Sequence, residues 1–171
     1  RSIPYYRVVE EMSADLVLRF YQPDSRIYDL GCSTGTTLEI LCRRAKQEGL
    51  KHLEILGIDS SSAMCERARD RLRMRCNEQE GFSVEVREQD VVEAAFPRAS
   101  AVILNYTLQF VPPFLRRKLL KRVYDDLLPE GILIVSDKTL QSRPEVSRVF
   151  SDNYYGFKRS MGYSELEISR K

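Results

Sequence analysis

The chain has 171 residues and a net charge of +2 at pH 7, with 43% hydrophobic and 30% charged residues. This length suits one domain with its own core, and the composition is ordinary for a soluble globular protein. The small net charge argues neither for nor against a nucleic-acid partner. Four cysteines without a C-x-x-C pair, and a single histidine at His52, disfavour both a metal site and a Cys–His nucleophile.

The sequence shows no signal peptide and no membrane span. Its longest uncharged stretch, residues 99–115, contains Asn105, Gln109 and two prolines, so it is too polar and too interrupted to cross a bilayer. The scattered cysteines suit free thiols in a reducing compartment. We therefore expect a cytoplasmic protein that has no membrane partner.

Hydrophobic periodicity predicts helices and strands in alternation. The first helix is expected over residues 6–20, with Val9, Met12, Leu16 and Phe20 on its buried face. Further helices are expected after the first, second, fourth and fifth strands. The predicted strands cover residues 26–30, 53–58, 82–87, 101–104 and 131–136. Such alternation favours an α/β fold with a doubly wound parallel sheet, for which we expect the strand order 3-2-1-4-5.

A glycine turn after the first strand is the most informative local pattern. An apolar run ends at Asp29, and Gly31 and Gly35 precede a helical pattern, an order that builds a nucleoside-binding crevice. A dinucleotide site would have G-x-G-x-x-G, but Ser33 and Thr36 occupy the second and third glycine positions. The pattern D-x-G-x-S-x-G instead resembles motif I of class I S-adenosylmethionine enzymes, in which the turn receives the methionine portion. The resemblance implies a Rossmann-like methyltransferase fold.

Polar residues follow the next three predicted strands, at the edge where such sheets bind ligands. Asp59 is a candidate for both ribose hydroxyls, or an N-cap for the helix that follows. Asp90 and the Val91 amide are candidates for the adenine, or Asp90 only forms a turn. Asn105 and Gln109 either line the crevice or satisfy polar groups in the core.

Basic residues crowd two of the predicted helices, over residues 67–75 and 116–122. Such runs are typical of solvated helix faces. Without interleaved exposed aromatic residues they do not indicate a nucleic-acid surface, and we expect no direct nucleic-acid binding.

The end of the chain lacks expected strands. Class I S-adenosylmethionine folds add two strands after the fifth, and the last thirty residues supply neither. Because an open strand edge is a pairing hazard, we expect residues 1–171 to be a single S-adenosylmethionine-binding α/β domain that lacks N- and C-terminal segments. The segment 157–171, with its basic residues beside Tyr163, is expected near the crevice mouth, against a second subunit, or as a plain surface helix.

Several longer segments carry a more specific resemblance. They are "RSIPYY" at 1–6, "YDLGCSTG" at 28–35, "LNYTLQF" at 104–110 and "FKRSMGYSELEIS" at 157–169. Together they resemble the bacterial carboxy-S-adenosylmethionine synthases, once described as transfer-RNA methyltransferases. The family implies S-adenosylmethionine or carboxy-S-adenosylmethionine as ligand, prephenate as the small-molecule substrate and a homodimer. Its product serves a partner enzyme that modifies the wobble uridine of transfer RNA.

The resemblance also assigns ligand contacts, though no catalytic residue. An arginine that pairs with the added carboxylate would follow Lys171, outside this sequence, and Tyr5 stands where the family commonly has a smaller residue. Two alternatives stay open: an ordinary S-adenosylmethionine-dependent (transfer-RNA) methyltransferase, and a non-catalytic S-adenosylmethionine-binding module. The implied contacts are Tyr6 near the first helix, Gly31, Cys32 and Ser33 under the amino-acid portion, Asp59 and Ser60 at the ribose, Asp90 and Val91 at the adenine, and Asn105 on the crevice floor.

Overall fold

The computed structural model describes residues 3–76, 81–139 and 141–169. Its contacts divide the chain into two compact units. The larger unit is Val8–Asp137, and the smaller one joins Arg1–Arg7 with Lys138–Lys171.

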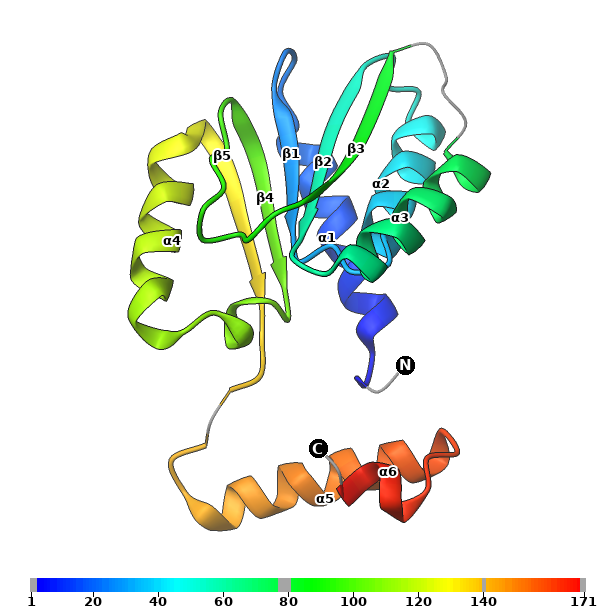
Figure 1. The fold of residues 1–171 in the computed structure, drawn as a ribbon, viewed down its shortest axis with the longest axis vertical. Helices are drawn as coiled ribbons and strands as arrows, with labels where there is room; N and C mark the ends of the chain where they lie inside the picture. The colour runs from blue at the N-terminus through cyan, green and yellow to red at the C-terminus, as the bar shows by residue number, and fades with distance from the viewer. Residues whose placement is uncertain (1–2, 77–80, 140, 170–171) are drawn as a thin grey trace. The chain divides into compact units, whose positions relative to one another are not determined.

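The larger unit is built on a five-stranded sheet in the order β3-β2-β1-β4-β5 (Figure 1). Every neighbouring pair of strands is parallel. The predicted strand order is therefore confirmed, and each predicted strand is present, although β5 begins at Leu127 rather than at residue 131. The strands are β1 (Arg26–Leu30), β2 (Leu53–Asp59), β3 (Phe82–Glu88), β4 (Ala99–Asn105) and β5 (Leu127–Ser136).

Helices cover both faces of the sheet, and each face has its own apolar core (Figure 1). Because successive strand residues point to opposite faces, Ile27 enters the core under α1, α2 and α3, while Tyr28 enters the core under α4. This burial on both sides explains why the central strands read as continuous apolar runs. The helices are α1 (Tyr6–Phe20), α2 (Thr36–Gln47), α3 (Ser62–Arg75) and α4 (Pro113–Asp126), with a 3₁₀ turn η1 (Leu108–Phe110) before α4.

The bounds of α1 agree with the prediction, but its buried face does not. The expected inward stripe is wrong, because Met12, Leu16 and Phe20 are 59%, 40% and 41% exposed. The side that packs on the sheet carries Ala14 and Val17 instead, together with buried polar side chains. Two faces of α1 are apolar, and periodicity alone selected the wrong one.

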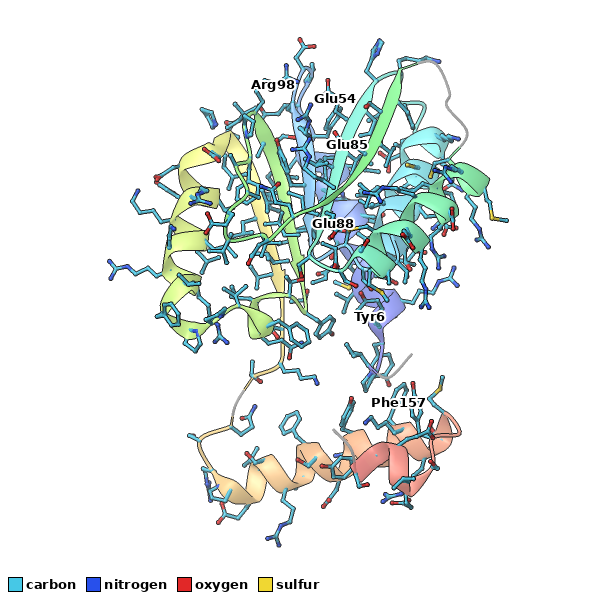
Figure 2. All side chains as sticks on the ribbon, in the orientation of Figure 1. Tyr6, Glu54, Glu85, Glu88, Arg98 and Phe157 are labelled. Atoms are coloured by element: carbon cyan, nitrogen blue, oxygen red, sulfur yellow. The ribbon has the colours of Figure 1, made fainter. Side chains whose placement is uncertain are left out.

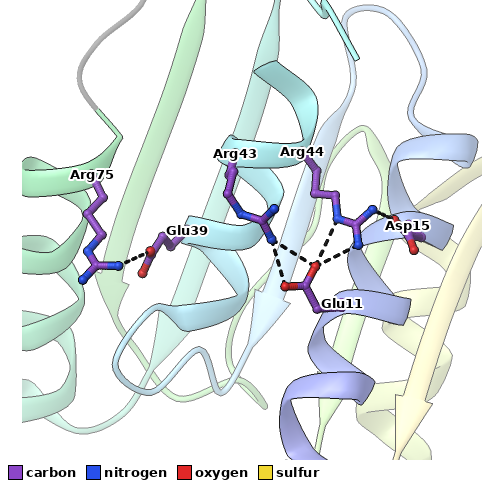
Figure 3. Close-up of polar contacts among 6 residues, drawn as sticks. All are labelled: Glu11, Asp15, Glu39, Arg43, Arg44 and Arg75. Carbon is purple, nitrogen blue, oxygen red and sulfur yellow. Dashed lines mark hydrogen bonds and ion pairs between the residues drawn. The ribbon is translucent and has the colours of Figure 1, made fainter. Parts of the chain in front are cut away.

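Ion pairs join α1, α2 and α3 at the surface (Figure 3). Glu11 of α1 accepts hydrogen bonds from both Arg43 and Arg44 of α2, at donor–acceptor distances from 2.8 to 3.1 Å. Glu39 of α2 in turn accepts from Arg71 and Arg75 of α3 at 2.9 and 2.7 Å. Part of the basic face of α3 is therefore engaged within the protein.

Strand β5 forms one edge of the sheet. Within the described part of the chain it pairs only with β4, and Val135 near its end is 44% exposed. The prediction that this edge lacks further strands is confirmed for these residues.

The smaller unit contains two helices, α5 (Pro144–Ser160) and α6 (Glu165–Ser169). Gly162, with a φ of +84°, lies in the turn between them. A capping box opens α6: Ser164 donates its hydroxyl and its amide to Glu167 Oε2 at 2.7 and 2.9 Å. No helix among the described residues is long and apolar enough to cross a membrane.

Candidate functional site

The glycine turn lies at the carboxyl ends of the central strands. The amides of Gly31 and Cys32 both donate to the carbonyl of Ile58, at 2.7 and 3.0 Å, which ties the end of β1 to the end of β2. Gly31 and Gly35 have φ values of +79° and +73°. These left-handed conformations explain glycine at both positions. The chain then turns into α2.

Thr107 packs against this turn from the end of β4. Its hydroxyl donates to the carbonyl of Leu30 at 2.7 Å, and a Cβ on Gly31 would lie 2.3 Å from Thr107 Oγ1. The sequence analysis missed this residue. A hydroxyl within "LNYTLQF" gave no signal of a partner far away in the sequence.

The side chain of Asp59 joins the end of β2 to the glycine turn. Its Oδ2 accepts the Ser33 amide at 2.9 Å, and its Oδ1 accepts the Ser61 amide at 2.9 Å. Ser61 is the N-cap residue of α3, so the carboxylate supports the helix start through the Ser61 amide rather than as the cap itself. Each carboxylate oxygen has two lone pairs, which leaves acceptor capacity for ribose hydroxyls. The exposed Ser60 follows directly.

Asp90 forms a turn after β3. Its Oδ1 accepts the Val92 amide at 2.8 Å, so the turn-forming interpretation is correct as far as this oxygen is concerned. The side chain of Val91 is buried in the core on the α4 face. Among the described residues no group accepts the Val91 amide hydrogen. That amide is available to a ring nitrogen of a ligand.

Asn105 is buried at the end of β4 and pairs with α1. Its Nδ2 donates to Ser13 Oγ at 3.1 Å. Gln109 donates to the carbonyl of Tyr106 at 3.0 Å. Both amides therefore satisfy polar groups of the protein, as one of the two open interpretations predicted. Ser13, which positions Asn105, lay outside the sequence prediction.

Asp29 is the acid of the motif and is 2% exposed. Burial, reinforced by the charges of Glu10 and Asp59, raises its pKa to about 7. Within the described residues its Oδ2 has no hydrogen-bond partner. A buried acceptor without a donor is costly, so this oxygen indicates a place for a hydrogen-bond donor of a ligand.

Cys32 follows Gly31 in the turn. Burial, with smaller effects from Asp29 and Asp59, raises the pKa of its thiol far above the ordinary value. A Cβ on Gly57 would lie 2.9 Å from its Sγ. Cys32 therefore stays a neutral thiol that packs against β2, and only its backbone is open to a ligand role.

Tyr6 is the one predicted contact outside the larger unit. It begins α1 but groups with the C-terminal helices in the smaller unit (Figure 2 labels it). Its ligand contact stays a prediction. The other predicted residues lie at the carboxyl ends of β1, β2, β3 and β4.

Comparison with known proteins decides the family. The methyltransferase domain profile matches residues 27–131. The whole chain is 40% identical to the carboxy-S-adenosyl-L-methionine synthase of Desulfotalea psychrophila, covering 67% of that protein. It is 42% identical to the synthase of Pseudomonas syringae pv. syringae, covering 68%. The chain belongs to the carboxy-S-adenosyl-L-methionine synthase family. The resemblance found in the sequence is confirmed.

Solved structures agree with the fold of this synthase-family chain. The match to YcgJ of Bacillus subtilis covers 85% of this chain and 57% of the YcgJ chain, with a TM-score of 0.61 and 16% sequence identity. The methyltransferase CalS10 of Micromonospora echinaspora was solved with S-adenosylmethionine bound. Its match covers 79% of this chain and 53% of the CalS10 chain, with a TM-score of 0.55 and 24% sequence identity. The class I methyltransferase fold is thus confirmed.

The family makes this protein an S-adenosylmethionine-dependent transferase, with S-adenosylmethionine as cofactor or substrate. The described site fits that molecule. Asp29 Oδ2 and the Val91 amide offer an acceptor and a donor that the described residues do not use.

Proposed function

We propose that this protein converts S-adenosylmethionine and prephenate to carboxy-S-adenosylmethionine and phenylpyruvate. The observation that carries the proposal is the match of the whole chain, at 40–42% identity, to proteins named carboxy-S-adenosyl-L-methionine synthase. Prephenate is the substrate implied by the sequence resemblance. The product would serve a partner enzyme that modifies the wobble uridine of transfer RNA.

The proposed reaction balances without an added oxidant or reductant. Prephenate loses its ring carboxylate as carbon dioxide and its hydroxyl as hydroxide, and the ring becomes aromatic. The sulfonium methyl group loses one proton, which combines with the hydroxide to give water, and its carbon forms a bond to the carbon dioxide. A water-poor pocket favours this course, because water would reprotonate the methyl carbon.

The proposed ligand contacts follow from groups at the sheet edge. Asp59 keeps acceptor capacity for the ribose, and the Val91 amide is not used by the described residues. Asn105 is held by Ser13 and would form the floor under the reacting end. We assign the turn of Gly31, Cys32 and Ser33 to the amino-acid portion, Asp59 and Ser60 to the ribose, Asp90 and Val91 to the adenine, and Tyr6 to a further ligand contact.

One mass-spectrometry experiment tests this function. The intact protein is incubated with S-adenosylmethionine, prephenate and transfer RNA, with the same mixture without prephenate as the control. We expect a nucleoside heavier by one carbon dioxide, and phenylpyruvate, only when prephenate is present. S-adenosylhomocysteine with methylated transfer RNA as the sole product would show an ordinary methyltransferase, and binding without any product would show a non-catalytic module.

We further propose a homodimer that acts in the cytoplasm without binding nucleic acid directly, with residues 1–171 working as one S-adenosylmethionine-binding domain. The exposed edge of β5 and the exposed apolar side chains of α5, such as Phe150, support an additional partner surface. Light scattering after size-exclusion chromatography gives the oligomeric state, and a transfer-RNA gel-shift assay tests the nucleic-acid part.

A further inference from the structure

One arginine of α3 contacts the glycine turn. The expected solvated helix face is present at Arg73 and Arg75, whose side chains are 76% and 63% exposed. The side chain of Arg71 is only 30% exposed, and its Nε donates to the carbonyl of Thr34, 37 residues away in the sequence, at 2.8 Å. Arg71 therefore differs from the arginines beside it, because it reaches the middle of the turn.

The same guanidinium also holds the start of α2. Arg71 Nη1 donates to Glu39 Oε2 at 2.9 Å, and the Glu39 side chain is 18% exposed. Glu39 lies in the first turn of α2. A guanidinium is planar, so its donors keep a fixed geometry relative to one another. Arg71 thus joins the Thr34 carbonyl to the helix that follows the turn.

The turn needs contacts from outside because its backbone is strained. The Gly35 amide donates to the Cys32 carbonyl at 2.9 Å, which makes Ser33 and Thr34 the central residues of the turn. Ser33 has a φ of +50°, a left-handed conformation that a residue with a side chain rarely adopts. Such a conformation persists only where the surrounding structure holds it. The hydrogen bond from Arg71 is one of the contacts that hold it.

Helix α3 and strand β2 hold the turn from two directions. A Cβ on Gly35 would lie 3.0 Å from the Cβ of Ala68, so α3 packs closely against the turn. Ala68 precedes Arg71 by three residues, and the two therefore lie on the same face of α3. The Ser33 amide donates to the Asp59 carboxylate of β2 at 2.9 Å. The conformation of the turn thus depends on side chains from other elements.

We propose that Arg71 is a positioning residue for S-adenosylmethionine: it holds the Thr34 carbonyl, and through it the conformation in which the turn binds the ligand. The inference rests on the proposed assignment of Gly31, Cys32 and Ser33 to the amino-acid portion of that ligand. A turn that is held before the ligand arrives loses less conformational freedom on binding, and the affinity is higher for that reason. Arg71 acts through the turn rather than by contact with the ligand.

Calorimetric titration of the intact protein with S-adenosylhomocysteine tests the proposal, because this ligand has no sulfonium methyl group and allows no turnover. Arg71→Met removes both hydrogen bonds of the guanidinium. We expect it to weaken binding about 5- to 30-fold, on the scale of hydrogen bonds from a charged donor.

The matched control is Arg75→Met. Arg75 pairs with the same Glu39 carboxylate at 2.7 Å (Figure 3), and Arg71 keeps both of its own hydrogen bonds in this variant. S-adenosylhomocysteine affinity should stay unchanged. Wild-type affinity in Arg71→Met would overturn the proposal, and so would an equal loss in the two variants.

Hydrogen exchange measured by NMR separates positioning from a general loss of stability. The Gly35 amide reports on opening of the turn, since it donates to the Cys32 carbonyl. We expect it to exchange about 10-fold faster in Arg71→Met, while the amides of β1 and β4 keep their wild-type rates. Faster exchange throughout the sheet to the same extent would show a purely structural role and overturn the proposal.

Arg71→Lys is the second variant. Lysine has one nitrogen in place of the two that Thr34 and Glu39 use, so we expect binding to weaken about 3-fold or more. If Arg71→Met does not fold, Arg71→Lys decides: wild-type affinity for S-adenosylhomocysteine overturns the proposal, and the expected loss supports it.

Failure of this inference is distinct from failure of the proposed function, because S-adenosylhomocysteine binding needs no turnover. If the wild type makes no carboxylated nucleoside but Arg71→Met weakens S-adenosylhomocysteine binding, the function fails and the positioning role stands. If the wild type makes the product while Arg71→Met keeps its affinity, the positioning role fails and the function stands.

Discussion

At the carboxyl ends of β4 and β1, the side chain of Thr107 fills the space that a side chain on Gly31 would need. The threonine hydroxyl bonds to the carbonyl of Leu30 at 2.7 Å, and a Cβ on Gly31 would lie 2.3 Å from that hydroxyl oxygen and 2.7 Å from the threonine methyl carbon. Glycine is therefore needed here for two reasons, the φ of +79° and the close approach of a side chain. The two strands meet as closely as they do because residue 31 has no side chain.

We predict that Gly31→Ala lowers the free energy of unfolding by more than the strain of a left-handed alanine alone would. The matched control is Gly49→Ala, since Gly49 has a φ of +73° and no atom lies within 4 Å of the place that its Cβ would take. The left-handed conformation costs alanine about 1–2 kcal/mol in both variants, and overpacking against Thr107 adds about 1–3 kcal/mol at Gly31. Urea denaturation measures both values.

Binding should separate the same two variants. Calorimetry with S-adenosylmethionine is expected to show weaker binding for Gly31→Ala and unchanged binding for Gly49→Ala, because only the first displaces the turn. Equal destabilisation of the two variants would mean that Thr107 moves aside freely, and the close approach would then have no energetic role.

The strands and their order were predictable because they depend on local patterns. Strands buried on both faces read as apolar runs, and a chain that alternates strands with helices has few allowed topologies. The glycine motif likewise located Gly31 directly after β1, and the end of the second apolar run located Asp59, the last residue of β2. These features need no knowledge of distant partners.

The parts that sequence reasoning missed depend on contacts between distant residues. Thr107 bonds to a carbonyl 77 residues away, and Ser13 pairs with an amide 92 residues away. Neither partner is visible in a hydroxyl residue taken alone. The predicted buried face of α1 was wrong for a related reason. Met12 and Leu16 form a regular apolar stripe, but the helix packs on the sheet through the side that carries Ala14.

Asp29 is predicted to make stability depend on pH. Burial raises its pKa from the ordinary 3.8 to about 7, so between these values the folded state holds a proton that the unfolded state has released. The free energy of unfolding therefore falls as pH rises through this window, by at most about 1.4 kcal/mol per pH unit from this group. Asp29→Asn removes the contribution.

The measurement is urea denaturation of the wild type and Asp29→Asn at several pH values from 4 to 8. We expect the stability of the variant relative to the wild type to increase up to about pH 7 and then to level off. A constant difference over the whole range would show that Asp29 titrates near its ordinary value in the folded protein.

Asp59 is predicted to contribute directly to ligand affinity. We expect Asp59→Ala to weaken S-adenosylmethionine binding by about 1–3 kcal/mol, the usual loss for hydrogen bonds to a charged group. Asp90→Ala provides a comparison: Asp90 is exposed and, among the described residues, its side chain accepts only the Val92 amide, whereas the two oxygens of Asp59 accept the amides of Ser33 and Ser61. Calorimetric titration measures both affinities, and a preference of the wild type for NAD would contradict the nucleoside assignment of this crevice.

The last prediction concerns the pairing of α1 with α2. Hydrogen bonds from Arg44, and then from Arg43, lower the pKa of Glu11, so this carboxylate stabilises the fold above the ordinary value of 4.5 and loses its contribution as pH falls below it. We expect Glu11→Gln to lower the free energy of unfolding by about 1 kcal/mol at pH 7, and by less at high salt.

The matched control is Asp70→Asn. The side chains of Asp70 and of its partner Arg73 are 69% and 76% exposed, so this variant should have no measurable effect on the free energy of unfolding. Urea denaturation at pH 7 and pH 4 checks both variants. An equal loss in Glu11→Gln at the two pH values would show that packing, rather than the charge of Glu11, holds α1 against α2.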